Sequence, residues 1–186
     1  MKESEGGYGI VSVINHWLAA IVVLTMLGLG LVFSGMERGP EKAALMKLHI
    51  SIGGTALLFL LFRIVWRAAQ GFPPFLTLAK WERKLAGFTH RALLTTIGLL
   101  LLTGPLIVWS GGNPISLFGV VTLPSPMEKN REFHEVLETL HFIAGKPLLL
   151  SLLALHLLGT LKHLIFDRGR MRLRMFHITS RAPEKI

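Results

Sequence analysis

Four long stretches of the chain are almost entirely apolar, and the segments between them are polar, charged or rich in glycine and proline. The first stretch lies between Glu5 and Glu37, where 31 consecutive residues include no Asp, Glu, Lys or Arg. A helix of about 20 predominantly apolar residues crosses the hydrocarbon core of a bilayer. We therefore predict transmembrane helices at about residues 16–35, 48–67, 92–110 and 136–165.

Residues at the ends of these stretches agree with this prediction. Trp66 and Arg67 follow the second stretch as an interfacial aromatic and a base that would snorkel to the interface, and Pro73 and Pro74 stop any helix beyond them. A cleaved signal peptide fits the first stretch less well, because the apolar run is longer than that of a signal peptide and no small-residue cleavage site follows it.

Composition favours an integral membrane protein over a soluble domain. The chain is 51% hydrophobic and 17% charged, with a mean hydropathy of +0.54. We expect an all-α, four-helix membrane bundle that forms a single domain over residues 1–186. The absence of cysteine excludes disulfides, zinc–thiolate sites, iron–sulfur clusters and cysteine nucleophiles, so redox chemistry would need a bound cofactor.

The basic residues indicate how the bundle is oriented. Four spans place both chain ends on one side, and the cytoplasmic side carries the excess of Lys and Arg. Of the 20 basic residues, 14 belong to segments on the side of the termini, so we expect both termini in the cytoplasm. These 14 are Lys2, Arg63, Arg67, Lys80, Arg83, Lys84, Arg91, Lys162, Arg168, Arg170, Arg172, Arg174, Arg181 and Lys185.

Residues 166–186 form a basic tail in this reading. Topology and contact with anionic lipid explain the tail and the formal net charge of +9, so we expect membrane lipid and not nucleic acid as a partner.

Several histidines lie at membrane depth, where an ionisable side chain is costly and suggests function. His49 and His141 fall near the outer face on two different spans, whereas His16 and His156 fall near the cytoplasmic face. His156 is 15 residues, about 22 Å, deeper than His141. Paired imidazoles from facing helices can supply both axial ligands of a haem iron. Two such pairs at different depths therefore predict two haems that carry electrons across the membrane. For any single histidine, a hydrogen bond to a neighbouring helix remains the alternative.

The two histidines of the fourth span must both face the bundle interior for this hypothesis to hold. Fifteen residues at 100° each leave an offset of about 60°. Pro147 breaks the backbone ladder and permits a kink or π-bulge that rotates one half of the helix, although a packing kink without a role is the alternative. Zinc fits less well because it takes four ligands at one point, and a proton pathway would use carboxylates that the spans almost lack.

The sequence resembles the prokaryotic cytochrome b561 family of four-helix di-haem membrane cytochromes. The resemblance covers about residues 8–175 and rests on YGIVSVINHWLAAIVV, on LHISIGG followed by RIVWR, on GGNPISLFG and on LHFIAGKPLLLSLLALHLLGTLKHLIFD. It implies that His16 and His156 ligate one haem b and that His49 and His141 ligate the other, which is the pairing already reached from depth.

One spacing departs from the family pattern. The family usually separates the two ligands of the fourth span by about 14 residues, and here His141 and His156 are 15 apart, which a one-residue bulge would reconcile. His134 competes with His141 for the outer ligand. It lies 22 residues, about 33 Å, from His156, too far out to share a level with His49.

Basic side chains near the two levels are candidates for binding haem propionates. Arg63 follows His49 by 14 residues and lies at the depth of the inner haem, where a buried cation needs an anion. Lys146 is the corresponding candidate at the outer haem. Lys162 and His163 are further candidates at the inner one, with a purely interfacial role as the alternative.

Three more positions are candidates for haem or quinone binding. His90 begins the third span, where the family often has a histidine, and would touch a propionate or line a quinone pocket; a polar interface residue is the alternative. Gly53 and Gly54 follow His49 closely and would let the macrocycle approach the backbone, with close helix packing as the alternative.

The resemblance implies a protein of the bacterial inner membrane and electron transfer linked to quinone. We expect a di-haem oxidoreductase that carries electrons between the pool of ubiquinone-type quinones and a small outer-facing donor or acceptor, such as superoxide, because the chain offers no large soluble domain for a bulky one. The alternatives are a membrane-anchor cytochrome subunit that docks a dehydrogenase or hydrogenase, and a structural bundle with packing histidines.

Overall fold

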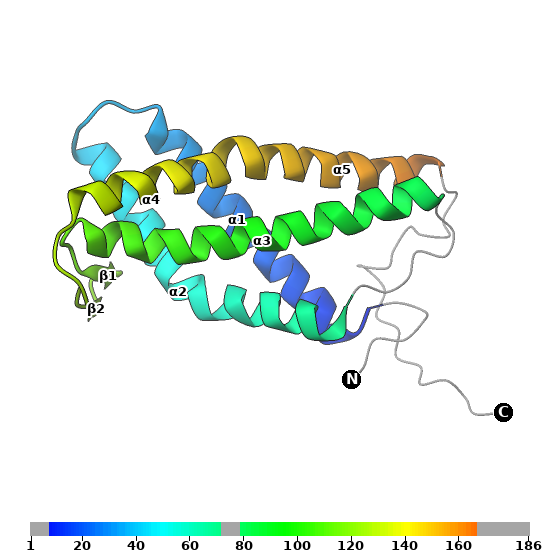
Figure 1. Cartoon of the computed structure of the whole chain (residues 1–186), viewed down its shortest axis with the longest axis horizontal. Helices are drawn as coiled ribbons and strands as arrows, with labels where there is room; N and C mark the ends of the chain where they lie inside the picture. Colours follow the sequence, from blue (N-terminus) through cyan, green and yellow to red (C-terminus); the bar gives the residue numbers. More distant parts are fainter. Residues whose placement is uncertain (1–7, 72–78, 167–186) are drawn as a thin grey trace.

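The computed structural model describes residues 8–71 and 79–166. They form four membrane-length helical columns and one short hairpin (Figure 1). The elements in chain order are α1 (Ile10–Ser34), α2 (Pro40–Gln70), α3 (Lys80–Ser110), β1 (Ile115–Leu117), β2 (Val121–Leu123), α4 (Arg131–Ile143), the π-helix η1 (Ala144–Leu148) and α5 (Leu149–Phe166).

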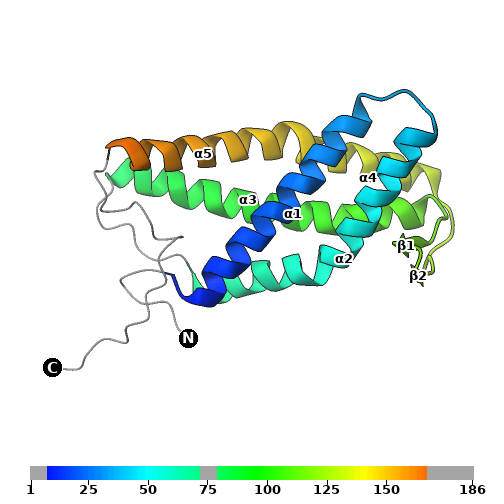
Figure 2. The ribbon, with the colours of Figure 1, turned by 180° about the vertical axis from the view of Figure 1, so that it is seen from behind.

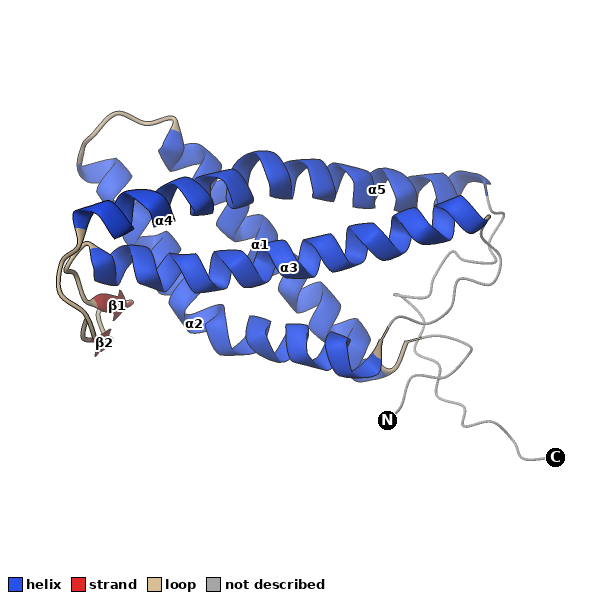
Figure 3. Cartoon of the chain, in the orientation of Figure 1, coloured by secondary structure: helices blue, strands red, loops and turns tan. Residues whose placement is uncertain are grey.

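The two ends of the bundle differ. α1 begins and α5 ends at one end, here called the terminal end, and the β-hairpin lies at the other, here called the hairpin end (Figure 1). α1 crosses the bundle diagonally in Figure 2, and α4, η1 and α5 run on as one column beside α3 (Figure 3).

Each of the four columns is long and apolar enough to cross a membrane, so the all-α membrane bundle expected from the sequence is confirmed. The helices extend past the apolar spans. α2 has 31 residues, about 46 Å of helix against a hydrocarbon core of about 30 Å. Its first residues include Glu41, Lys42 and Lys47, because a backbone that already hydrogen-bonds internally can continue as helix into the polar interface.

Packing inside the bundle uses small hydroxyl side chains, while many large apolar ones face outward. Thr89, Thr96, Thr103 and Ser110 recur every seven residues on α3 and are all at most 4% exposed. Leu58, by contrast, is 76% exposed. Because lipid is as apolar as leucine, burying large apolar side chains between membrane helices gives little stabilisation. Helices instead pack closely along small residues, and the large side chains contact lipid.

Two residues at the end of α2 pack inward against α1. Trp66 Nε1 donates a hydrogen bond to Ser12 Oγ at 2.9 Å. Arg67 is only 4% exposed and lies 5.0 Å from the centre of the Tyr8 ring, so the expectation that it snorkels outward is wrong. The cation is satisfied inside by the aromatic face and by the carbonyl of Gly71 at 2.8 Å.

The hairpin was not expected from the sequence, which indicated only a connecting segment between the third and fourth spans. β1 and β2 pair antiparallel, and Ser51 of α2 fastens the turn by donating to the Ser116 carbonyl and accepting from the Phe118 amide, both at 3.1 Å. Phe118 and Gly119 have positive φ angles of 52° and 74°, which the tight turn requires.

The fourth column contains the distortion that Pro147 permits. Ala144–Leu148 forms one turn of π-helix between two regular α-helices. A π-turn absorbs one extra residue. The 15-residue separation of His141 and His156 therefore acts nearly as 14, which reduces their angular offset to about 40°.

Candidate functional site

Two pairs of imidazole rings lie inside the bundle, one toward each end. His49 of α2 faces His141 of α4 near the hairpin end, with ring centroids 6.4 Å apart. His16 of α1 faces His156 of α5 near the terminal end, with centroids 6.3 Å apart. The sequence placed the same side chains at shared depths, and the structure brings them together in those pairs.

The spacing within each pair fits one metal ion between two imidazoles. A metal–imidazole bond is about 2.0 Å long and the ring centroid lies about 1 Å behind the nitrogen, so two opposed ligands put their centroids about 6 Å apart. Direct packing of two rings would allow shorter distances, since aromatic pairs pack with centroids as close as about 4.5 Å. Both pairs are therefore spaced like axial ligands of a haem iron.

A cavity of about 620 Å³ lies at the hairpin-end pair, within the usual range of cofactor pockets. His49 and His141 line it together with mostly apolar side chains of α1, α2, α3 and α4. Gly30 and Gly104 also line it, and a Cβ atom on either would lie 3.8 or 3.7 Å from Cε1 of His49 or His141. The missing side chains leave room beside both rings, as a flat macrocycle would need.

Gly53 and Gly54 line the same cavity, but each also serves close packing. A Cβ atom on Gly53 would lie 2.8 Å from Met26 Cε, and one on Gly54 would lie 2.6 Å from Leu117 Cδ2 of the hairpin. Gly54 therefore lets the hairpin rest directly on α2.

Thr103 fixes the orientation of His141, which sequence reasoning did not identify. The Thr103 hydroxyl is 2.8 Å from the Leu99 carbonyl and 2.8 Å from His141 Nδ1. Because it donates its single proton to the carbonyl, it accepts from the Nδ1–H of His141. The lone pair of the ring is thereby placed on Nε2, the arrangement that metal-binding histidines need.

Arg63 reaches the terminal-end pair from α2. Its Nη1 donates to Asn15 Oδ1 at 3.0 Å, and its Nη2 lies 3.0 Å from Nδ1 of His16. A guanidinium has donors only, so Nδ1 of His16 accepts this hydrogen bond. Asn15, which is 4% exposed, is a further residue that sequence reasoning missed.

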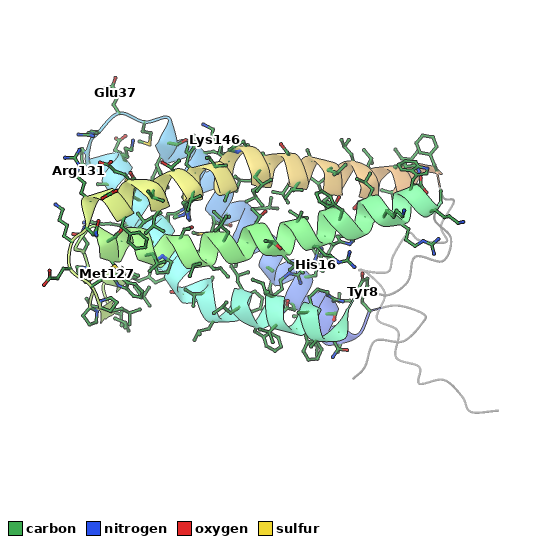
Figure 4. All side chains as sticks on the ribbon, in the orientation of Figure 1. Tyr8, His16, Glu37, Met127, Arg131 and Lys146 are labelled. Carbon is green, nitrogen blue, oxygen red and sulfur yellow. The ribbon has the colours of Figure 1, made fainter. Side chains whose placement is uncertain are left out.

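Two of the remaining candidates lie near the pairs. The His90 ring is 5.4 Å from that of His156, which makes a third imidazole at the terminal-end level. Lys146 lines the hairpin-end cavity and lies 5.4 Å from the centre of the Phe142 ring. Figure 4 shows His16 toward the terminal end and Lys146 toward the hairpin end.

Lys162 and His163 lie near the end of α5. Lys162 forms an ion pair with Glu82 and lies 5.7 Å from the Trp81 ring centre, so its charge already has a partner on α3. His163 lies one residue further along and is partly buried.

His134 lies away from the His49 level. Its Nδ1 is 2.9 Å from the carbonyl of Ile107 and 3.3 Å from Ser110 Oγ. These contacts fasten α4 to the end of α3. In the described part of the chain, moreover, no three His, Asp or Glu side chains gather closely enough to hold a metal ion by themselves.

Comparison with known proteins shows the family of the chain. The family model of prokaryotic cytochrome b561 matches residues 7–177. This chain belongs to the prokaryotic cytochrome b561 family. It is similar to cytochrome b561 homolog 2 of Escherichia coli K12, with 32% identity over 173 residues that cover 90% of each chain. The protein is therefore a multi-pass membrane cytochrome that binds b-type haem and transfers electrons.

Proposed function

We propose that this cytochrome b561 binds two b-type haems, one at each level of the bundle. His49 and His141 would hold the haem of the hairpin end, and His16 and His156 that of the terminal end. Each haem would supply one-electron chemistry. The observation that carries the proposal is the recurrence of one spacing, 6.4 and 6.3 Å between ring centroids, in two imidazole pairs from different helices.

Arg63 fits the role of a propionate partner at the terminal end. A histidine that ligates through Nε2 keeps its proton on Nδ1, and this nitrogen then cannot accept a hydrogen bond. Arg63 would therefore release His16, keep its contact with Asn15, and be free for a carboxylate. Lys146, which lines the other cavity, has the corresponding role at the hairpin end.

We propose Lys162 and His163 only as secondary propionate partners at the terminal end. The ion pair of Lys162 with Glu82 leaves it less available to a propionate than Arg63. Gly53 and Gly54 contribute by keeping the cavity wall thin at α2.

The protein would carry single electrons across a bacterial inner membrane between a small outer-facing donor or acceptor and the quinone pool. The excess of basic residues on the side of the termini supports an inward terminal end and an outward hairpin end. Superoxide is the small donor that we propose for the hairpin end. We place the quinone near His90, whose ring borders His156.

Rapid mixing tests this function. The purified protein should be reduced by superoxide and reoxidised by a water-soluble ubiquinone analogue, and His90→Ala should slow only the second reaction while both haems stay bound. Unchanged quinone kinetics in His90→Ala would remove His90 from the quinone site. Reduction only after a larger soluble subunit is added would favour the membrane-anchor alternative.

A further inference from the structure

A second cavity, a groove of about 570 Å³, follows the first half of α3 on the outside of the bundle. Three cations line it: Arg83, Lys84 and Arg91. Phe88, which is 61% exposed, lies between them, and Leu148 of η1 adds apolar surface from the neighbouring column. The groove does not include any of the paired histidines.

The three cations lack a partner of opposite charge. Among the described residues, none of the three forms an ion pair with a carboxylate, and the nearby Glu82 pairs with Lys162. Arg83 and Lys84 also directly follow the first turn of α3, the end of a helix where its dipole favours anions over cations. The groove is thus electropositive with nothing in the described chain to balance it.

Small side chains line the rest of the groove on α3: Ala92, Thr95 and Thr96. Thr96 is only 3% exposed. These short side chains leave space along the helix for an acyl chain.

The length of the groove fits one lipid of one leaflet. From Arg83 to Thr96 the helix rises by 13 residues, about 20 Å, whereas half of a bilayer's hydrocarbon core is about 15 Å and the headgroup adds the remainder. Cations gather at the interfacial part, and Phe88, Thr96 and Leu148 accompany the deeper part. The excess of basic residues on one side of the membrane explains why Arg83, Lys84 and Arg91 are numerous. It does not explain why they lie along a groove.

We propose that this groove binds an anionic phospholipid. Arg83, Lys84 and Arg91 hold the phosphate headgroup, and an acyl chain lies against Phe88 and Leu148. The lipid joins α3 to the η1–α5 column. This site is independent of the haem-ligand assignment, since it shares no residue with either histidine pair.

Native mass spectrometry of the full-length holoprotein tests the site. The protein released from micelles should retain phosphatidylglycerol and not phosphatidylcholine. Arg91→Gln should weaken the phosphatidylglycerol adduct about fivefold, and the triple replacement of Arg83, Lys84 and Arg91 by Gln more strongly, following the usual effect of one cation near a charged headgroup. Lys80→Gln is the matched control, because Lys80 is exposed on the same helix but does not line the groove.

Three results would overturn the proposal. They are equal retention of phosphatidylcholine by the unchanged protein, an equal loss of adduct in Lys80→Gln and Arg91→Gln, and complete displacement of the lipid by inorganic phosphate at equal concentration. The first needs no variant, so it decides the matter even where the triple variant fails to fold.

Discussion

Hydrogen bonds at the paired histidines differ in kind between the two levels. At the hairpin end, Thr103 accepts the Nδ1 proton of His141 and so holds the ring in the tautomer that leaves Nε2 free. At the terminal end, Arg63 donates to Nδ1 of His16. At the hairpin end a neutral hydroxyl thus holds the histidine, whereas at the terminal end the histidine contacts a cation that would change partner on haem binding.

Replacing Thr103 tests the first of these contacts. Thr103→Val keeps the shape but leaves the Nδ1–H of His141 buried without an acceptor, so haem affinity at the hairpin-end site should fall roughly 10- to 100-fold. Thr103→Ser should restore it. Haem transfer to an apoprotein acceptor, followed optically, measures the loss, and the redox potential of the same haem should shift.

Thr89→Val is the control for this prediction. Thr89 is also buried, at the same heptad position of α3, and its hydroxyl donates to the Leu85 carbonyl of its own helix. Equal haem loss in Thr89→Val and Thr103→Val would mean that packing along α3, not the hydrogen bond, is responsible.

Individual residues differed in how far the sequence could predict them. The paired histidines could be placed because helix rise alone gives their depth, and depth decides which of them meet. The roles of Thr103 and Asn15 could not be predicted. A polar side chain in an apolar span can equally serve helix packing, and only its partner on another helix shows what it does. Lys162 is a propionate candidate from the sequence, with an interfacial role as the alternative, and the structure pairs it with Glu82 near the start of α3.

Among the elements, η1 has the clearest consequence for the site. Its π-turn takes up one residue between His141 and His156 and turns both rings toward the interior. The sequence allowed this prediction, since Pro147 in mid-span forces a break in the ladder. The hairpin could not be predicted from the sequence. Strands of three residues are too short to show an alternation of apolar and polar side chains. Ser51, which holds the hairpin, is also far from it in the sequence.

Changing the length of this column tests the role of η1. Deleting Gly145 of η1, which keeps Lys146, should convert the π-turn into regular α-helix and leave both haems bound, because the bulge already absorbs one residue there. Inserting one alanine after Leu152 should rotate His156 by about 100° and remove the terminal-end haem. Pyridine haemochrome assays of the two purified variants measure the difference. Loss of haem in the deletion with retention in the insertion would contradict the account of η1.

For the whole molecule, the charge asymmetry fixes the expected direction of the bundle. With 14 of 20 basic residues on the side of the termini, a reporter fused after Ile186 should read as cytoplasmic and one inserted near Asn113 as periplasmic. A phosphatase and a fluorescent protein at both positions give complementary signals. The opposite pattern would exchange the inner and outer haems and place the quinone on the other face.

The central claim is that two histidine pairs hold two haems at separate levels. Haem quantitation combined with a redox titration, on the unchanged protein and on each single histidine variant, measures this directly. We predict about two haems per chain, and about one in each variant, with His16→Ala and His156→Ala losing one redox component and His49→Ala and His141→Ala losing the other. A stoichiometry of one haem, or loss of the same component in His16→Ala and His49→Ala, would contradict the account.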